Sequence, residues 1–437
     1  MARPRIVIVG AGFAGFAAAR TLARLARGGA EIVVVNPTDY FLYLPLLPEV
    51  ATGILEPRRV TVSLAAALPG VRVVLGHADE FDLGGHRIGY RDPEGGRGTL
   101  GYHRLVIAAG SVNKLLPVPG VTRYAHGFRG ISEALYLRDH ITRQIEMAAT
   151  ATSPEEQRAR CTFVVVGAGY TGTEVAAQGV RYTRDLVEHR PELRGEPRWL
   201  LIDTADRVLP SLDERLARAS DAVLRERGVE VRTGTSVEEA RAAGVQLSTG
   251  EFVATRSLIW CVGVRPDPMV AELGLPLNQG RLVVDEFLSV PGQPDVYAAG
   301  DAAAVPDLTM PGQLTGMTAQ HAVRQGAVVA KNIAASYGRG RRRAYRHHDL
   351  GFVVDLGGLD SAANPLGVPL KGFPAKVVTR GYHLLSMPGN RIKVAADWLL
   401  DTLLPRQGVQ LGLVPGEAVP LDSATPAAAR IQSVRPS

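Results

Sequence analysis

The sequence predicts an α/β protein with two Rossmann-like dinucleotide-binding domains and a smaller C-terminal region. Residues 10–15 read Gly-Ala-Gly-Phe-Ala-Gly and follow the apolar run Ile6–Val9. Residues 167–172 read Gly-Ala-Gly-Tyr-Thr-Gly and follow the apolar run Phe163–Val166. Both segments pass into helical patterns, and this strand–turn–helix context separates a dinucleotide loop from a chance match. Two loops of this kind predict two dinucleotides.

Each glycine of the first loop has its own role. Gly10 permits the tight turn, Gly12 lets the backbone come close to a pyrophosphate, and Gly15 lets the helix pack on the strand. The free N–H groups and partial positive charge at the helix N-terminus favour the phosphates. The second loop repeats the three positions as Gly167, Gly169 and Gly172.

The residue at the end of the next strand differs between the two loops. Asn36 follows the first loop by ~20 residues, where an acid usually receives the adenosine ribose hydroxyls. Asp203 ends the strand predicted over Arg198–Ile202 after the second loop. Because an acid accepts both ribose hydroxyls and repels a 2′-phosphate, the second site favours NADH over NADPH.

The composition excludes several other classes. A chain of 437 residues is too long for one core, and its net charge of +6 is modest, with basic residues scattered outside 339–346. Nucleic-acid binding is therefore not predicted. Cys161 and Cys261 are the only cysteines, which disfavours a redox dithiol and Cys-based metal sites, and no metal is predicted. With no visible signal peptide and no run of ~18 apolar residues, we expect a soluble or peripheral protein.

The segment from Tyr40 to Pro48 is apolar and interrupted by prolines, so it is predicted as a loop rather than a helix. Exposed aromatic and leucine side chains on a loop are unusual. They are expected to pack on a flat apolar group or to line a pocket for one, although a plain core loop is the alternative.

Two further strands end on small residues. Leu105–Ala108 runs into Ala109-Gly110, where a backbone can approach a cofactor, and Val296–Ala299 runs into Gly300-Asp301, where a carboxylate can bond sugar hydroxyls. A helical pattern from Leu314 to Tyr337 follows. Gln320 and Arg324 share one face of this helix, either as a surface pair or as part of a site.

The C-terminal region contains a helical pattern over Arg391–Leu404 with Trp398 on an apolar face and basic residues at its start. This helix docks on the protein core or lies in a membrane interface, and the pattern allows both. The chain from Val419, rich in Pro, Ala and Ser, is predicted to be a disordered tail.

Taken together, these motifs resemble the type II NADH dehydrogenases, single-chain flavoproteins of the disulfide-reductase superfamily. The resemblance rests on both glycine loops, the Pro45-Leu46-Leu47 loop, Gly300-Asp301 and Ala319-Gln320-His321-Ala322. It covers roughly residues 5–410. The glycine loops and Gly300-Asp301 are shared by the superfamily, whereas the Pro-Leu-Leu loop and the Ala-Gln segment are more discriminating.

The resemblance implies two cofactors and a division of the chain. FAD is expected on the first loop and NADH, rather than NADPH, on the second. The implied FAD residues are Gly10, Gly12, Phe13, Ala14, Gly15, Asn36, Pro45, Ala109, Gly110, Gly300, Asp301, Ala319 and Gln320, and the implied NADH residues are Gly167, Gly169, Gly172, Asp203 and Gly263. The implied segments are FAD domain 1–125 and 286–345, connection 126–160, NADH domain 161–285, C-terminal quinone- and membrane-facing region 346–418, and tail 419–437.

The resemblance also implies the reaction: a hydride passes from NADH to FAD, and two electrons then pass to a quinone without proton pumping. Glu174 is expected near the nicotinamide, and Gln320 near the flavin ring and the quinone carbonyl. Arg324 stands where the family often has a glutamine, and is expected either to donate to a quinone oxygen or to indicate a more acidic acceptor. A peripheral position on the cytoplasmic face of the membrane is implied, while a homodimer remains open.

Other functions compete with this interpretation. A reductase feeding a ferredoxin- or rubredoxin-like protein needs a protein-docking patch in place of the apolar loop at Tyr40–Pro48. A sulfide:quinone oxidoreductase needs paired cysteines near the flavin, whereas Cys161 and Cys261 fall within the second domain. A low-turnover flavin redox regulator is suggested only by the departures at Asn36 and Arg324.

Overall fold

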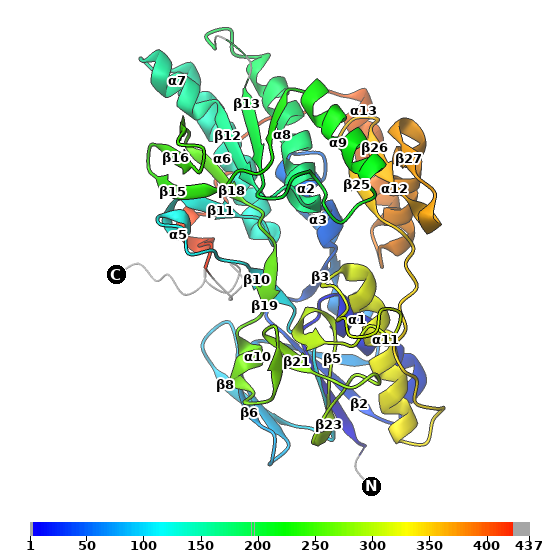
Figure 1. Cartoon of the computed structure of the whole chain (residues 1–437). Helices are drawn as coiled ribbons and strands as arrows, with labels where there is room; N and C mark the ends of the chain where they lie inside the picture. Colours follow the sequence, from blue (N-terminus) through cyan, green and yellow to red (C-terminus); the bar gives the residue numbers. More distant parts are fainter. Residues whose placement is uncertain (1–2, 194, 196, 423–437) are drawn as a thin grey trace.

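The structure is a computed structural model that describes residues 3–193, 195 and 197–422. Two α/β domains lie one above the other, each built on a twisted sheet with a parallel core (Figure 1). The C-terminal helices lie against the upper domain. This arrangement confirms the predicted class of two dinucleotide-binding domains with a smaller C-terminal region.

The lower domain contains the first glycine loop. Its sheet has the strand order β22-β23-β9-β1-β2-β5, parallel except for the edge pair β22–β23. The strands of the sheet are β1 Arg5–Val9, β2 Glu31–Asn36, β5 Val71–Leu75, β9 Arg104–Ile107, β22 Ser289–Val290 and β23 Gln293–Ala298. The helices that cover it are α1 Phe13–Ala26, α4 Leu64–Ala67 and α11 Ala319–Ser336.

The upper domain contains the second loop and repeats the plan. Its sheet has the order β11-β18-β12-β13-β14 and is parallel throughout. The strands of this sheet are β11 Ala125–Gly127, β12 Thr162–Val166, β13 Arg198–Ile202, β14 Val229–Arg232 and β18 Ser257–Trp260. The main helices are α6 Ile131–Ala149, α7 Pro154–Arg160, α8 Tyr170–Val187 and α9 Glu214–Glu226.

Each domain also carries a three-stranded antiparallel sheet, which is inserted in the sequence between β5 and β9 in the lower domain and between β14 and β18 in the upper one. These sheets are β6 His77–Asp82, β7 Arg87–Arg91 and β8 Arg97–Gly101 below, and β15 Val237–Arg241, β16 Gly244–Leu247 and β17 Phe252–Ala254 above. The chain crosses between the domains on β10 Ser111–Asn113 and β19 Val264–Pro266, which pair antiparallel. The two glycine loops therefore face one another across a short two-stranded connection.

The segment predicted as a loop over Tyr40–Pro48 is in fact structured. It holds β3 Tyr40–Leu42, the 3-10 helix η1 Leu44–Leu46 and the start of α2 Leu47–Ala51. Pro48 does not stop α2 because it lies in the first helical turn, whose N–H groups have no intrahelical partner. Four of the apolar side chains in the segment are buried, namely Phe41, Tyr43, Leu46 and Leu47.

The remaining short elements connect these parts. They are α3 Pro57–Val60, β4 Thr61–Ser63, α5 Val121–Tyr124, α10 Met269–Glu272, β20 Leu277–Asn278, β21 Arg281–Val283, η2 Gly300–Ala302 and β24 Ala303–Ala304. The C-terminal region holds β25 Val353–Asp355, β26 Ser361–Ala363, η3 Pro365–Gly367, β27 Leu370–Lys371, α12 Gly372–Ser386, α13 Arg391–Leu403 and η4 Gly416–Ala418.

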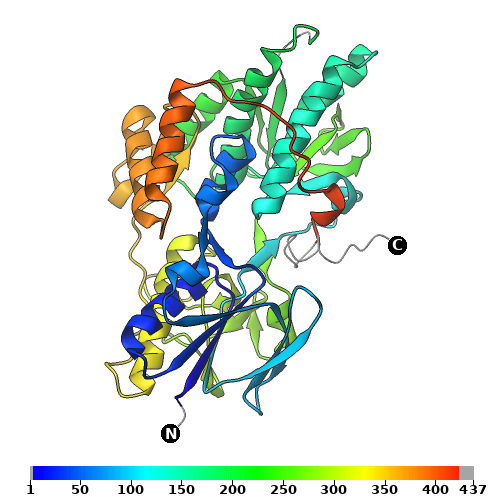
Figure 2. The same cartoon turned by 180° about the vertical axis from the view of Figure 1, so that it is seen from behind.

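After α13 the chain runs back across α6, as Figure 2 shows. The Asp139 carboxylate on α6 accepts hydrogen bonds from the N–H groups of Leu411 and Gly412. The predicted tail starts at Val419, but Val419 and Leu421 are buried, and the Leu421 carbonyl accepts a bond from Asn113. The rest of that tail, 423–437, lies outside the described residues.

Candidate active site

A cavity of about 1340 Å³ lies between the two domains and is lined by both glycine loops. It gathers residues that are far apart in the sequence. The predicted site residues that line it are Gly10, Gly12, Phe13, Ala14, Asn36, Pro45, Ala109, Gly110, Gly167, Gly169, Glu174, Asp203, Gly263, Gly300, Asp301, Ala319 and Gln320. Gly15, Gly172 and Arg324 are not among the lining residues.

The backbone of the first loop requires glycine at two of its three positions. Gly10 has φ +94°, and a Cβ there would lie 2.3 Å from the Ala108 carbonyl oxygen. A Cβ on Gly15 would lie 1.8 Å from the Gly10 carbonyl oxygen. A Cβ on Gly12 would meet nothing within 4 Å, because this position faces the cavity. That open space at the N-terminus of α1 is where a pyrophosphate fits.

Asn36 and Asp203 hold the two loops in the same way. The Asn36 Oδ1 accepts a bond from the Ala11 N–H at 2.8 Å, and the Asp203 Oδ2 accepts one from the Ala168 N–H at 2.6 Å. Asn36 also donates to the Thr38 carbonyl at 2.8 Å, whereas the other oxygen of Asp203 accepts from the Ala205 N–H. The first site has therefore replaced the charge but kept the hydrogen bond that fixes the loop.

Asp301 lies where the first domain closes over the cavity. Its Oδ2 accepts a hydrogen bond from the Ser111 hydroxyl at 2.6 Å. Burial raises the pKa of the Asp301 carboxyl, an effect that the Ser111 bond and the positive charge of Arg281 partly offset. The carboxylate can accept bonds from the hydroxyls of a sugar alcohol at this edge of the cavity.

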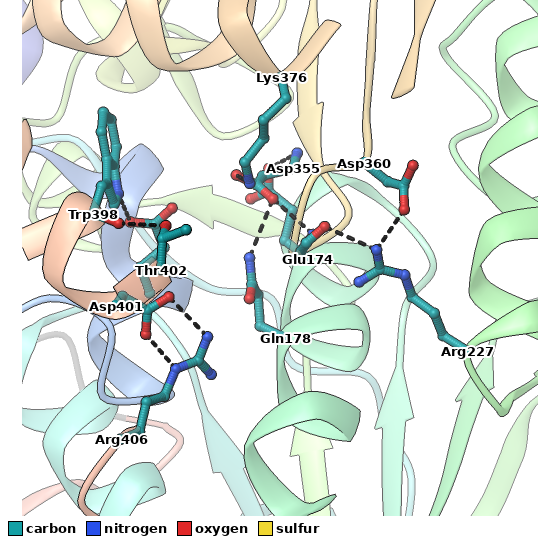
Figure 3. Close-up of polar contacts among 12 residues, drawn as sticks. Glu174, Gln178, Arg227, Asp355, Asp360, Lys376, Trp398, Asp401, Thr402 and Arg406 are labelled. Carbon is teal, nitrogen blue, oxygen red and sulfur yellow. Dashed lines mark hydrogen bonds and ion pairs between the residues drawn. The ribbon is translucent and has the colours of Figure 1, made fainter. Parts of the chain in front are cut away.

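Glu174 is the fifth residue of α8 and connects this helix to the C-terminal region (Figure 3). Its Oε1 accepts a bond from the Asp355 N–H at 2.9 Å, and the Asp355 carboxylate pairs with the Lys376 ammonium at 2.5 Å. Burial raises the pKa of the Glu174 carboxyl well above its usual range, and the nearby carboxylates of Asp355 and Glu49 raise it further. The bond from the Asp355 N–H and the charge of Lys376 oppose this shift in part, and the net effect favours the protonated form of Glu174 more than in an exposed glutamate.

Gln320 lies at the N-terminal end of α11, where its amide nitrogen makes a hydrogen bond and its amide oxygen makes none in the described part of the chain. Its Nε2 donates to the Gly351 carbonyl at 2.7 Å, which turns the amide oxygen toward its buried surroundings. The Oε1 atom is buried and has no hydrogen-bond partner in the described part of the chain. An unpaired buried acceptor at the cavity wall fits a bound group that carries an N–H or O–H donor.

Arg324 does not hold the predicted position. It lies behind the cavity wall, where it donates to the His348 carbonyl and lies 3.2 Å from the His347 Nδ1. Arg324 lies one turn of α11 after Gln320. The segment after Tyr345 passes α11 here, and its residues His347 and His348 contact the guanidinium. The guanidinium is therefore held by the segment that carries His347 and His348, and the role of Arg324 toward an acceptor stays a prediction.

Two groups of histidines that the sequence reasoning missed also line the cavity. His321 stacks on His347 with 3.9 Å between ring centroids and lies 2.8 Å from the Tyr345 hydroxyl. His383 on α12 lies 3.1 Å from the Tyr43 hydroxyl. Burial lowers the pKa of both His321 and His383 to about 4, so each is a neutral imidazole near neutral pH.

The signal for part of this site was present in the sequence of α12. Lys376, Arg380 and His383 recur at helical spacing and share one face. A charged helix face ordinarily meets solvent, but Lys376 and His383 are buried here, while Phe373 and Val377 are exposed. The polar face of α12 is thus turned toward the protein, where His383 lines the cavity.

Comparisons with known proteins agree with this geometry. Residues 4–326 match the family of pyridine nucleotide-disulphide oxidoreductases. The type II NADH:quinone oxidoreductase Ndh of Mycobacterium tuberculosis is 30% identical over 431 residues, which cover 93% of this chain and 89% of that protein. The demethylphylloquinone reductase NdbB of a Synechocystis species is 30% identical over 413 residues, with coverage of 92% and 97%.

A solved structure also shares the fold. The structure of NDH2 from Plasmodium falciparum in complex with NADH superposes with a TM-score of 0.86 at 18% identity, and covers 93% of this chain and 100% of that one. At this identity the likeness is one of fold alone. The sequence match over almost the whole length carries the assignment: the chain belongs to the pyridine nucleotide-disulphide oxidoreductases and, within them, to the type II NADH:quinone oxidoreductases.

Proposed function

We propose that the protein is an FAD-dependent NADH:quinone oxidoreductase in which the first glycine loop holds FAD and the second holds NADH. FAD supplies the redox chemistry: it accepts a hydride from NADH and passes two electrons to a quinone. The observation that carries the proposal is the single cavity shared by two glycine loops with the same backbone conformation.

The residues present fit these two groups. The space at Gly12 and Gly169 suits a pyrophosphate on each loop, because a Cβ added at either glycine would meet no atom within 4 Å. Asp301 would accept bonds from the ribityl hydroxyls of FAD, and Gln320 Oε1 would accept one from the flavin or the acceptor. Asp203 would receive the adenosine ribose of NADH and would repel a 2′-phosphate.

The chain orients its substrates through the groups around the cavity. Glu174 in its protonated form, which burial favours, can donate a hydrogen bond to a nicotinamide carboxamide without placing a charge beside it. Phe352 stacks on Tyr170 with 5.4 Å between ring centroids and closes one side of the second loop. These apolar rings exclude water from the space where the hydride would pass.

The test is an anaerobic titration of the purified yellow protein. NADH is expected to bleach the flavin absorbance, and a short-chain quinone is expected to restore it within the turnover time. Bleaching without restoration would overturn the quinone as acceptor and favour a protein electron carrier. No bleaching by NADH, with bleaching by dithionite as the control, would overturn the nicotinamide assignment itself.

We further propose that helices α12 and α13 bind the protein to a membrane surface. They lie side by side at the edge of the molecule in both views (Figures 1 and 2). Leu385, Ile392 and Leu403 are 77%, 86% and 68% exposed. In the described part of the chain, no helix is both apolar enough and long enough to span a bilayer. Such an apolar face favours binding in the interfacial plane.

The two acids on α13 do not oppose this binding. Asp397 pairs with Arg59 at 2.7 Å, and Asp401 pairs with Arg406, so both point toward the protein. Val394 and Trp398 are buried, so the helix docks on the core by one face and presents leucines on the other. Both predicted roles of this helix are therefore compatible.

A flotation assay with liposomes tests the membrane proposal. Leu399→Glu combined with Leu403→Glu is expected to release the protein, because it places two charges in the apolar face. Leu277→Glu is the matched control, since Leu277 is exposed elsewhere on the molecule. Equal flotation of the three proteins would overturn the assignment of this face.

A further inference from the structure

A second cavity, of about 280 Å³, lies one helical turn beyond Glu174. It is enclosed by α8 of the upper domain and by α12 and α13 of the C-terminal region, as Figure 3 shows for several of its side chains. We call it the arginine cavity, after Arg181, Arg380 and Arg406, which line it together with Gln178 and Lys376. Leu359, 59% exposed, lies at its mouth.

The positive charges of the arginine cavity exceed the anions that pair with them. Lys376 pairs with Asp355 at 2.5 Å, and Arg406 pairs with Asp401 and lies 3.7 Å from Asp185. Arg181 and Arg380, by contrast, make no ion pair within the described ranges of the chain. Arg380 instead lies over the Trp398 ring, 4.9 Å from its centroid.

Several polar atoms of the cavity are buried without a partner. Among the described residues these are Arg406 Nη1, Arg380 Nε and Gln178 Oε1. The Arg406 side chain is only 8% exposed, and its Nη1 lies 3.7 Å from the Asp185 carboxylate without a hydrogen bond to it. An unmade hydrogen bond of a buried charged group is costly, and two of these three atoms are donors.

The remaining acid does not balance the charge. Burial raises the pKa of the Glu49 carboxyl to about 7, and its Oε2 accepts a bond from the Trp398 indole at 2.5 Å. Burial also lowers the pKa of Arg181, and the positive charges of Arg406 and Arg227 lower it further. Asp185 and Asp401 offset these like charges only in part, so the pKa of Arg181 stays lowered.

We propose that the arginine cavity binds a phosphate-type oxyanion, held between the Arg181 and Arg380 guanidinium groups. Guanidinium groups bind phosphate oxygens through paired N–H donors, and Arg406 Nη1 offers one more donor to the same space. The volume is several times the ~30 Å³ of one water molecule, which leaves room for a phosphate and a small substituent.

The oxyanion has two possible sources with the same chemistry. One is a free phosphate or phosphate ester that enters past Leu359. The other is the phosphodiester headgroup of a lipid, because Thr402 at the cavity wall lies between Leu399 and Leu403 in the sequence of α13. In either case the bound anion would lie next to Lys376 and Gln178. Both hydrogen-bond the carboxylate of Asp355, whose backbone N–H donates to Glu174.

Binding is tested on the full-length flavin-loaded protein with inorganic phosphate. Phosphate is expected to raise the melting temperature by about 2 °C over sodium chloride at equal ionic strength, because it binds the folded state alone. Arg181→Gln is expected to weaken phosphate binding by about tenfold, and Arg181→Gln with Arg380→Gln to abolish it. Arg218→Gln is the control, because Arg218 forms an exposed pair with Glu214.

Leu359→Glu is a second variant, chosen because an exposed position tolerates substitution. It supplies a carboxylate at the mouth, which is expected to raise the melting temperature without phosphate and to weaken phosphate binding by about tenfold. This variant keeps the test decisive even if the arginine variants do not fold. Equal phosphate binding by the wild type and the Leu359→Glu variant would overturn the proposal.

Vesicles separate the two sources. If inorganic phosphate does not bind, phosphatidylglycerol vesicles are expected to bind the wild type more tightly than Arg181→Gln, with phosphatidylcholine vesicles binding both equally. Absence of an Arg181 dependence with both phosphate and phosphatidylglycerol would overturn the proposal. None of these readouts requires NADH or quinone turnover, so the result is independent of the proposed reaction.

Discussion

The two glycine loops have the same backbone and different surroundings. Gly10 and Gly167 have φ +94° and +104°, and a Cβ on either would lie 2.3 Å from a carbonyl oxygen of the neighbouring strand end. Gly15 and Gly172 approach the loop equally closely. The loop geometry is thus set by close packing of backbone, and it is indifferent to which dinucleotide is bound.

The differences lie in the side chains around that common backbone. Asn36 stands in the first domain where Asp203 stands in the second, and Ala17 stands on α1 where Glu174 stands on α8. The first domain is also closed by α11, which packs so tightly on α1 that a Cβ on Gly326 would lie 2.1 Å from the Ala14 carbonyl oxygen. We interpret the site closed by α11 as one for a resident cofactor, and the site with Asp203 and Glu174 as one for a substrate that leaves.

The largest expected effect comes from the glycine that packs each helix on its strand. Gly172→Ala is expected to lower kcat/KM for NADH by more than about 100-fold, because its Cβ would lie 1.9 Å from the Gly167 carbonyl oxygen. The FAD content, measured by absorbance, is expected to stay near one per chain. Gly15→Ala is expected to do the reverse and yield protein without FAD. If both variants lost the same cofactor, the assignment of the two loops would be wrong.

The acid at the second strand end gives the next largest effect. Asp203→Ser is expected to raise the ratio of NADPH to NADH turnover by about tenfold or more, since it removes a charge that faces a 2′-phosphate. The NADH affinity is expected to fall as well, because Asp203 accepts bonds from the Ala168 and Ala205 N–H groups. Steady-state kinetics with both nucleotides measure the two effects. An unchanged ratio would show that Asp203 does not face the ribose.

Glu174 can be made to resemble its counterpart on α1. Glu174→Ala is expected to slow flavin reduction by NADH about tenfold, because it removes the acceptor of the Asp355 N–H and a donor to the nicotinamide. Glu174→Gln is expected to retain most of the rate, because burial favours the protonated carboxyl and a neutral glutamine amide resembles that form. Stopped-flow absorbance measures the reduction. A glutamine variant as slow as the alanine variant would show that the ionised form is needed.

The smallest expected effect concerns Glu49, a buried acid whose charge acts on Glu174. Burial raises the pKa of the Glu49 carboxyl to about 7, so the folded state binds its proton more tightly than the unfolded chain. Stability from this group is therefore present at low pH and is lost as the pH rises from about 4.5 to about 7. In the Glu49→Gln variant, the free energy of unfolding is expected to fall by about 1–3 kcal/mol less over this pH range than in the wild type. Urea unfolding at pH 5 and pH 8 measures it, and parallel pH profiles would contradict the assignment.

The sequence was sufficient for the parts of the molecule that repeat a local rule. The glycine loops, the strand over Arg198–Ile202 and the helix over Arg391–Leu404 follow from turn chemistry and periodicity, and the structure confirms them with a shift of one residue at most. These elements depend on residues that are near one another in the sequence, so one sequence is enough to predict them.

The parts that could not be predicted depend on contacts between distant segments. Pro48 was taken as a helix breaker, although its place in the first turn of α2 makes it acceptable. Arg324 was assigned to the acceptor because the segment that takes up its guanidinium, at His347 and His348, follows it by more than twenty residues. The polar face of α12 could not be assigned from the sequence, because the ion pair between Lys376 and Asp355 joins distant segments.

The closure of the lower domain by late segments has a consequence for synthesis. Strand β23 and helix α11 come from residues 293–336, whereas the loop and strands they complete come from the first 107 residues. The sheet of the upper domain lies entirely within residues 125–260. During translation the upper domain can therefore fold as soon as its own residues have left the ribosome. Until β23 has been made, the edge of β9 in the lower sheet has no partner strand. The first strand to be made therefore belongs to a sheet that is completed only after the whole sheet of the upper domain.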